Sequence, residues 1–285
     1  MPSPDMTNGT MDRTAFLRDG AINQKTGSSR SWTLAGGARL IIDLAWHSRI
    51  GYSSHERHQL LPFAEPSIAI RRSFAPCGAT LDWDFVVFPA RLDGGVYDPE
   101  PGEEIFALRL SPERMETQLG IPVCEYMVHT RYLPSSLSAQ LEPVRYLADG
   151  DRFETAWKAM AYVLLKHAQD SAMDRLSYAA ALLRCSGGGV SPAELAELAE
   201  ISPRHLRRGF AQRFGLSPRD LTRRLRLTSA LLEAERQKAP HWAEIAAGHR
   251  FADQAHLIRE CQALVGSSPR NWHKLRRNLA VSFNT

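Results

Sequence analysis

The chain has 285 residues, of which 44% are hydrophobic and 23% are charged, and its formal net charge is +4. These values are typical of a globular protein, and the length predicts two folded units. No apolar run approaches the roughly 20 residues that a membrane-spanning helix needs, and the polar N-terminus lacks the pattern of a secretory signal. Four widely spaced cysteines without a C-x-x-C pair do not indicate a zinc ribbon or a disulfide framework, so we expect a cytoplasmic protein.

The first third of the chain predicts a tail followed by strands. Residues 1–31 are rich in Ser, Thr, Asn and Gly, which predicts a flexible N-terminal tail. Short apolar runs then alternate with turn residues, as is typical of β-strands. The predicted strands are Leu40–Trp46, Ile68–Phe74, Trp83–Phe88 and Glu104–Leu110.

Helical spacing replaces this pattern after residue 110. Ser111 before Pro112 predicts the start of a helix, and Gly120 predicts its end. Two further helices are predicted over Arg152–His167 and Ala172–Cys185.

A run of three glycines predicts a division of the chain. Residues 186–189 are Ser-Gly-Gly-Gly, and consecutive glycines leave the backbone almost unconstrained. We therefore expect a hinge at 186–189 between a sensor or dimerisation domain over 32–185 and an all-helical domain over 190–285.

The charge is divided unevenly between these domains. Residues 190–285 contain 16 Lys and Arg against 9 Asp and Glu, a balance of +7, whereas residues 1–189 have a balance of −3. A basic domain of this kind is typical of polyanion binding, and solvated Arg-rich helix faces produce the same balance. Charge alone leaves both interpretations open.

One sequence pattern occurs twice in the basic domain. Leu195, Ala196 and Ile201 of the first copy have their counterparts 50 residues later, and the positions from Leu206 onward have theirs 51 residues later. One extra residue therefore precedes the second helix of the second copy. The later counterparts are Ile245, Ala246, Phe251, Leu257, Arg259, Val265, Gly266, Ser268 and Pro269.

Each copy has the features of a helix-turn-helix. Ala196 and Ala246 are small where two helices must cross closely. Ser202 is predicted to cap the second helix of the first copy, with Pro203 at its first position. The remaining boundaries are predicted from helix-ending Gly215 and Gly266 and from the Ser-Pro pairs at 217–218 and 268–269, which start the next helices.

This doubled pattern resembles the DNA-binding domain of the AraC/XylS family of transcription regulators. The resemblance covers about residues 185–277 and includes F-x-x-x-x-G-L-S-P, a connecting helix from Pro218 to about Ala234, and F-A-D-Q-A-H-L-x-R. It implies an α+β protein with an N-terminal cupin-like β-barrel or sandwich with helices, followed by an all-α domain. It also implies two recognition helices held about 34 Å apart, so that one monomer enters two successive major grooves.

The resemblance assigns DNA contacts by position. Arg suits guanine and Gln suits adenine in the major groove, whereas phosphate contacts position the protein without reading sequence. The alternative for each residue is an ordinary solvated side chain. The implied base-contacting residues are Arg204, His205, Arg208, Gln254, Ala255, His256 and Arg259, and the implied phosphate-contacting residues are Arg207, Arg223, Arg224 and Arg226.

Two residues of the second copy depart from the family pattern. Arg250 stands where the turn normally has Gly, so the turn either adopts a positive φ with strain of about 1 kcal/mol or is reshaped. Cys261 stands where the first copy has Phe210, which predicts a smaller core.

The N-terminal domain offers no catalytic motif. The resemblance implies that it senses an effector or mediates dimerisation, and its strand aromatics are either core or the walls of a ligand pocket. His47, His55 and His58, with Glu56, raise the question of a metal site, but their spacing matches no strong pattern and favours a solvated loop. We therefore expect no metal, no cofactor and no enzymatic activity. The aromatic residues in question are Trp46, Trp83, Phe85, Phe88 and Phe106.

The sequence thus favours a sequence-specific DNA-binding transcription regulator. The expected partners are double-stranded DNA, a small-molecule effector, RNA polymerase if the protein is an activator, and a second copy in a homodimer, with no membrane. Two alternatives stay open: a cupin-type metalloenzyme with a DNA-binding appendage, and a non-specific nucleoid-type binder.

Overall fold

The computed structural model describes residues 22–23, 29–33, 42–52, 58–60, 62, 65–90, 94–97, 100–126, 131–148, 153–168 and 172–278. Most of the predicted N-terminal tail lies outside these ranges. Its described residues form strand β1 (Ile22–Asn23) and the first part of β2 (Ser29–Thr33), and both pair with the main sheet.

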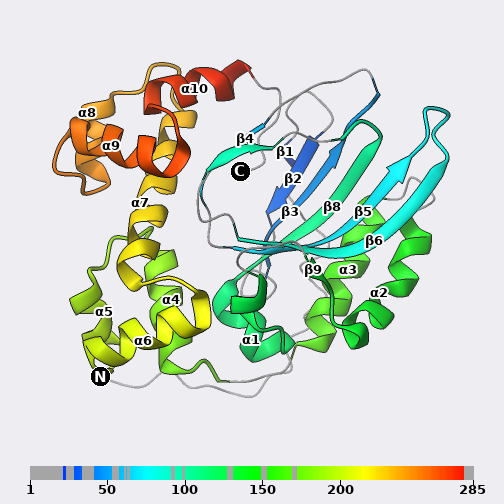
Figure 1. Ribbon diagram of the computed structural model, residues 1–285, viewed down its shortest axis with the longest axis horizontal. Coiled ribbons are helices and arrows are strands. Elements are labelled where there is room, and N and C mark those ends of the chain that lie inside the picture. Colours follow the sequence, from blue (N-terminus) through cyan, green and yellow to red (C-terminus); the bar gives the residue numbers. More distant parts are fainter. Residues whose placement is uncertain are drawn as a thin grey trace.

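An antiparallel sheet flanked by helices forms the N-terminal part of the molecule (Figure 1). Its strand order is β1-β2-β3-β8-β5-β6-β9, so β1 and β9 are the edges and the described strands form an open sheet. This confirms the α+β class. The predicted strands correspond to β3 (Ile42–Arg49), β5 (Ser67–Phe74), β6 (Thr80–Phe88) and β8 (Glu103–Leu110); β9 is Arg131–Tyr132, and β4 (His58–Leu60) pairs with β7 (Gly95–Tyr97) in a second sheet.

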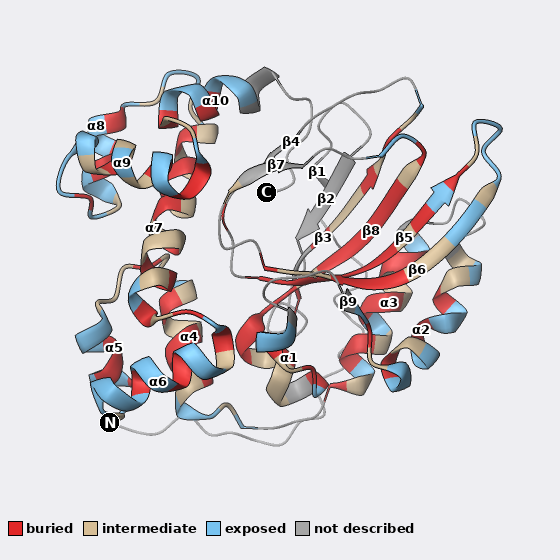
Figure 2. Cartoon of the chain, viewed as in Figure 1, coloured by how far each residue is buried: buried red, intermediate tan, exposed pale blue. Residues whose placement is uncertain are grey.

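Both faces of the central strands are buried, as the red colour of β5 and β8 in Figure 2 shows. Because successive side chains of a strand point to opposite faces, Phe106 and Leu108 enter the main core with the helices, whereas Ile105 and Ala107 form a smaller cluster on the other face. Burial on both faces explains why these strands read as nearly continuous apolar runs.

Helices α1 to α4 follow the sheet in the chain. Helix α1 has Pro112 in its first turn, and Gly120 ends it in the left-handed conformation with φ 66°, as predicted. Two of the other helices begin within three residues of their predicted starts. The elements are α1 (Pro112–Leu119), the 3-10 helix η3 (Val123–Tyr126), α2 (Ser135–Ala148), α3 (Phe153–His167) and α4 (Arg175–Cys185).

The sequence analysis missed helix α2. Pro143 lies inside this helix, where proline removes a backbone hydrogen bond and normally prevents helix formation. The signal that would have found α2 is the spacing of Leu137, Leu141 and Val144, which are all buried on one face.

Six helices follow in the described residues 192–278, and the predicted Ser-Pro and Gly signals mark both ends of α6, the starts of α7 and α10 and the end of α9. The Ser202 hydroxyl accepts a hydrogen bond from the His205 amide at 3.2 Å, and Gly215 and Gly266 end their helices with φ of 65° and 72°. The helices are α5 (Pro192–Leu198), α6 (Pro203–Phe214), α7 (Pro218–Glu235), α8 (Trp242–Gly248), α9 (Gln254–Val265) and α10 (Pro269–Asn278). None of the helices in the described ranges combines the length and apolar composition needed to cross a bilayer.

The glycines after α4 form a packed turn. Gly187 and Gly188 have φ of 56° and 77°, and the Gly188 amide donates to the Leu183 carbonyl at 2.9 Å. A Cβ at Gly188 would lie 2.5 Å from the carbonyl oxygen of Thr222 in α7, so only glycine fits at this approach. Helix α7 thus holds the turn in this structure, and the domain boundary at 186–189 stays a prediction.

Candidate nucleic-acid interface

Two helix-turn-helix units lie along one connecting helix. In Figure 1 helix α7 runs between the α5–α6 pair and the α8–α9 pair, and both pairs lie on the side of the molecule away from β5 and β6. Helix α7 has 18 residues, which corresponds to a length of about 27 Å. One rigid element therefore sets the separation of the two units.

The first recognition helix, α6, divides into a buried and an exposed face. Leu206, Phe210 and Phe214 are buried in the core at intervals of four residues. The predicted base-contacting residues of this helix all lie on the exposed side, together with the predicted phosphate contact: they are Arg204, His205, Arg208 and Arg207.

Helix α6 crosses α4 at very close range. A Cβ at Gly209 would lie 2.5 Å from a methyl carbon of Leu176, so a larger residue at this position would require the Leu176 side chain to move. Glycine inside a helix is less favourable than alanine by about 1 kcal/mol. The close approach of Leu176 favours glycine at this position in spite of that cost. The sequence analysis did not single out Gly209, although an isolated glycine between helical leucine and phenylalanine residues is the signal for such a contact.

Arg213 fixes α6 to the N-terminal part of the molecule. Its guanidinium lies 2.6 Å from a carboxylate oxygen of Asp174, which caps α4, and 3.2 Å from Glu116 of α1. Although burial alone raises the pKa of Asp174, hydrogen bonds from the Ser177 amide and from Arg213 outweigh this and hold that pKa below its ordinary value. This arginine therefore acts as a structural tether.

The second recognition helix, α9, exposes three of its four predicted base-contacting residues. Gln254, Ala255 and Arg259 are exposed. His256 is half-buried, because its Nδ1 accepts a hydrogen bond from the Ala252 amide at 3.3 Å and its ring packs on Phe251 with centroids 5.4 Å apart. The imidazole is therefore held at the start of α9.

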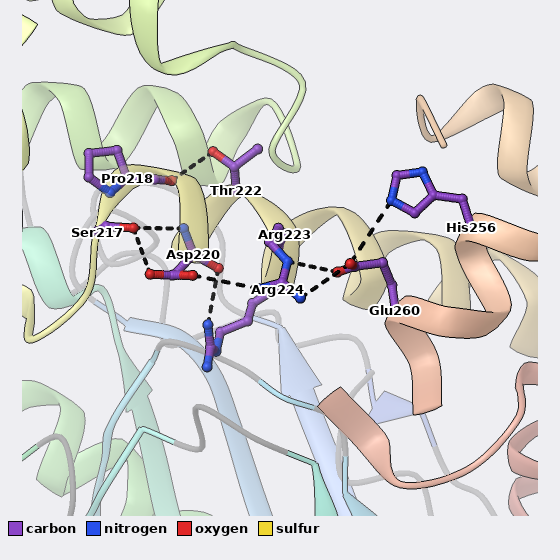
Figure 3. Close-up of polar contacts among 8 residues, drawn as sticks. All are labelled: Ser217, Pro218, Asp220, Thr222, Arg223, Arg224, His256 and Glu260. Atoms are coloured by element: carbon purple, nitrogen blue, oxygen red, sulfur yellow. Dashed lines mark hydrogen bonds and ion pairs between the residues drawn. The ribbon is translucent and has the colours of Figure 1, made fainter. Parts of the chain in front are cut away.

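Figure 3 shows Arg223 of α7 and His256 of α9 both directed at Glu260. The Arg223 Nε and Nη2 atoms donate to the two Glu260 carboxylate oxygens at 2.8 and 3.2 Å, and the His256 Nε2 atom lies 4.0 Å from Glu260 Oε1. Hydrogen bonding to Glu260 raises the pKa of Arg223. The sequence analysis did not find Glu260, because the crossing of α7 and α9 decides which opposite charges meet.

The other two predicted phosphate contacts on α7 also have protein partners. Arg224 donates to the Asp220 carbonyl at 3.3 Å, and Arg226 donates to the carbonyls of Arg250 and Gly188 at 3.2 and 3.4 Å. Arg223, Arg224 and Arg226 therefore brace α7 in this structure, and their contacts with phosphate stay a prediction.

The turns of both units have a residue in the left-handed conformation at the same position. Arg250 has φ 57°, so of the two alternatives expected for this turn, the positive φ is the one observed. Glu200, 50 residues earlier, has φ 52°. The two turns close alike, with the Ile201 and Phe251 amides donating to the carbonyls of Ala196 and Ala246 at 3.0 and 2.9 Å.

Cys261 lies in the core of the second unit. It is fully buried, and burial raises the pKa of its thiol to about 12, so the thiol is neutral at physiological pH. It packs in a cluster that includes Leu257 and Trp272 and is distinct from the core that holds Phe210.

The five aromatic candidates of the N-terminal domain do not gather in one place. Phe85 and Phe106 are buried in the main core, and Trp83 packs against it. Trp46 and Phe88 instead meet on the opposite face of the sheet, with ring centroids 6.3 Å apart.

Among the histidine candidates, the structure describes the side-chain contacts of His47. The His47 Nε2 atom lies 2.8 Å from Glu104 Oε1, and the other oxygen of this buried carboxylate accepts from Arg72 Nε at 2.5 Å. His55, Glu56 and the side chain of His58 lie outside the described residues. Within the described part of the chain, no group of three potential metal ligands comes together.

Comparison with known proteins places the doubled motif in a family. A family model described as a helix-turn-helix domain matches residues 195–275. No curated protein matches the chain.

Among solved structures, the chain is similar to a point variant of apo ToxT from Vibrio cholerae, with 10% identity over 81% of this chain and 97% of that chain and a TM-score of 0.45. ToxT from the same organism with a bound unsaturated fatty acid matches at 10% identity over 91% and 99% of the two chains, with a TM-score of 0.43. The C-terminal domain of AraT, a response regulator from Geobacillus stearothermophilus, matches at 23% identity over 39% and 90%, with a TM-score of 0.33.

TM-scores this low do not establish a common fold. The assignment therefore depends on the family match and on the two units that the structure places along α7. The chain therefore carries a helix-turn-helix domain over residues 195–275, built from two units along α7.

Proposed function

We propose that this chain is a transcription regulator that recognises specific DNA sites by inserting α6 and α9 into successive major grooves. The observation that supports this most directly is that both helices expose side chains suited to base edges while a single helix fixes their separation. A protein that binds only through charge needs no such pair of exposed reading faces.

The proposed contacts follow from side-chain chemistry. Arginines on each helix donate to guanine O6 and N7, and Gln254 pairs with adenine. Ala255 offers its methyl group to thymine, and the two histidines lie beside the arginines at the helix starts. The base-contacting set is Arg204, His205, Arg208, Gln254, Ala255, His256 and Arg259, and Arg207 is the exposed phosphate contact on α6.

The N-terminal domain is proposed to sense a small-molecule effector or to mediate homodimerisation on a cupin-like sheet. The main hydrophobic core supports such control, because it runs without interruption from the sheet residues Ile70 and Leu108 to Leu206 and Phe210 of the first recognition helix. The printed description of one ToxT structure names a bound unsaturated fatty acid, which makes fatty acids a first class of effector to test here. RNA polymerase is the further partner if the regulator is an activator.

Selection of binding sites from a randomised duplex library, followed by titration of the selected and random duplexes, tests this function. We expect the selected site to bind roughly 10³-fold more tightly than random DNA or better. Equal affinity for both would support the nucleoid-type alternative, and stoichiometric metal in the purified protein would support the metalloenzyme alternative.

A further inference from the structure

Two arginines converge on the glycine turn between α4 and α5. Arg226 lies halfway along α7 and donates to the carbonyls of Arg250 and Gly188 at 3.2 and 3.4 Å. Arg250, in the turn of the second unit, donates through its own guanidinium to the carbonyl of Gly189. The turn, the connecting helix and the second unit thus meet at one point that carries two positive charges.

Two carboxylates attract these charges at longer range, Glu260 acting on Arg226 and Glu194 on Arg250. Every acceptor of the two guanidinium groups is a neutral backbone carbonyl, and within the described ranges neither group forms an ion pair. The nearby acids are engaged elsewhere, since Glu260 binds Arg223 and Glu194 caps α5 with Ser191.

The polar atoms of Arg226 are incompletely satisfied. Its Nε atom is buried and has no hydrogen-bond acceptor among the residues that the structure describes. Burial, together with the charge of Arg250, lowers the pKa of Arg226. An anion placed between the two guanidinium groups would remove this electrostatic cost, and arginine pairs bind phosphate oxygens well.

The backbone of Arg250 supports a role beyond the fold of the turn. Its φ of 57° is unfavourable by about 1 kcal/mol for a residue with a Cβ, whereas glycine adopts it freely. The hydrogen bond from the Phe251 amide to the Ala246 carbonyl, at 2.9 Å, closes the turn without any help from the arginine side chain. The exposed guanidinium is therefore the feature that a glycine would not supply.

We infer that Arg250, supported by Arg226, forms a phosphate-binding site for the DNA backbone midway between the two recognition helices. The inference depends on the proposed function, because a duplex that offers successive major grooves to α6 and α9 carries its intervening backbone past the middle of α7. The site contacts phosphate only, so it contributes affinity and register without base preference.

The test compares Arg250→Gly with Glu200→Gly at the equivalent turn position of the first unit. Both substitutions relieve a left-handed residue, but only the first removes a guanidinium. A labelled random-sequence duplex of about 30 base pairs is titrated at several salt concentrations, and melting curves confirm that both variants are folded. We expect Arg250→Gly to reduce the salt slope by about one and to weaken selected and random duplexes by the same factor, and Glu200→Gly to leave the slope unreduced.

Arg250→Gln repeats the test while keeping the backbone strain, and it should show the same reduced slope. An unchanged slope in Arg250→Gly and Arg250→Gln, with normal binding by the unaltered protein, would overturn the phosphate site alone. A changed preference at one base pair would also overturn it, because it would make Arg250 a base-reading residue. Failure of the unaltered protein to bind any duplex would overturn the proposed function and this site together.

Discussion

The two helix-turn-helix units share their turns and helix boundaries but are attached to the molecule in different ways. The first unit belongs to the core of the N-terminal domain, and Arg213 ties it to Asp174 and Glu116. The second unit shares a separate core with the C-terminal half of the connecting helix, and Arg223 and Glu260 add an ion pair between α7 and α9. The same local sequence pattern is therefore attached in two ways: the first unit shares one hydrophobic core with the N-terminal sheet, whereas the second packs mainly on the connecting helix.

The largest expected difference between the units lies in their cores. Phe210→Ala should lower the free energy of unfolding by about 3–5 kcal/mol, because it removes a fully buried ring from the core shared with the sheet. Cys261→Ala, at the equivalent position, should cost only about 1 kcal/mol because the lost volume is small. Urea unfolding measures both values, and equal losses would contradict the smaller contribution expected of Cys261.

A smaller effect is expected on DNA recognition. Arg208→Ala and Arg259→Ala should each cost about 1–3 kcal/mol of site binding and relax the preference at one base pair, in different half-sites. Binding to duplexes with single substitutions in the selected site measures this. If either variant keeps the affinity and preference of the unaltered protein, that residue does not read a base.

Arg223 of α7 and Glu260 of α9 should show a coupling free energy of about 1 kcal/mol in protein stability. Arg223 and Glu260 are partly exposed, with side-chain exposures of 36% and 17%, so solvent weakens their interaction. Arg223→Gln, Glu260→Gln and the double variant form a cycle that isolates the pair from other effects. Additive stability losses would show that the pair does not fix the second recognition helix.

The smallest expected effect is a dependence of the first unit on acid. The pKa of Asp174 is lower in the folded protein than in the unfolded chain, so its carboxylate stabilises the fold above the unfolded value. This contribution should decline as the pH falls through about 4 and be absent below the folded-state pKa. Asp174→Asn should flatten this part of the stability profile. If the variant and the unaltered protein have the same dependence of stability on pH, the Asp174 carboxylate does not stabilise the contact with Arg213.

The sequence predicted what local signals determine. The Ser202 cap and the left-handed Gly215 and Gly266 at the helix ends follow from residues within a few positions of each other, whereas the sequence left open whether Arg250 adopts a positive φ. Contacts between distant segments were not predictable. Arg184 and Glu113, for example, form a hydrogen bond of 2.6 Å across 71 residues, and only the packing of α4 on α1 brings them together.

In the candidate site too, local features could be predicted from the sequence and contacts between distant segments could not. The exposure of Arg204, Arg208 and Arg259 follows from helical periodicity. The partners of Arg223 and the half-buried state of His256 depend on Glu260, whose position required the crossing of two helices to be known.

The packing of α4 beneath the first unit has a practical consequence for dissecting this protein. Ala179, Ala180 and Leu183 of α4 are buried, and this helix contacts α5, α6 and α7. A truncated polypeptide that starts at Ser186 would leave those three helices with a bare apolar surface, which promotes aggregation. A polypeptide that starts at Asp174 is longer by α4 and its cap, which cover these surfaces of α5, α6 and α7, and we expect it to remain in solution and bind DNA by itself.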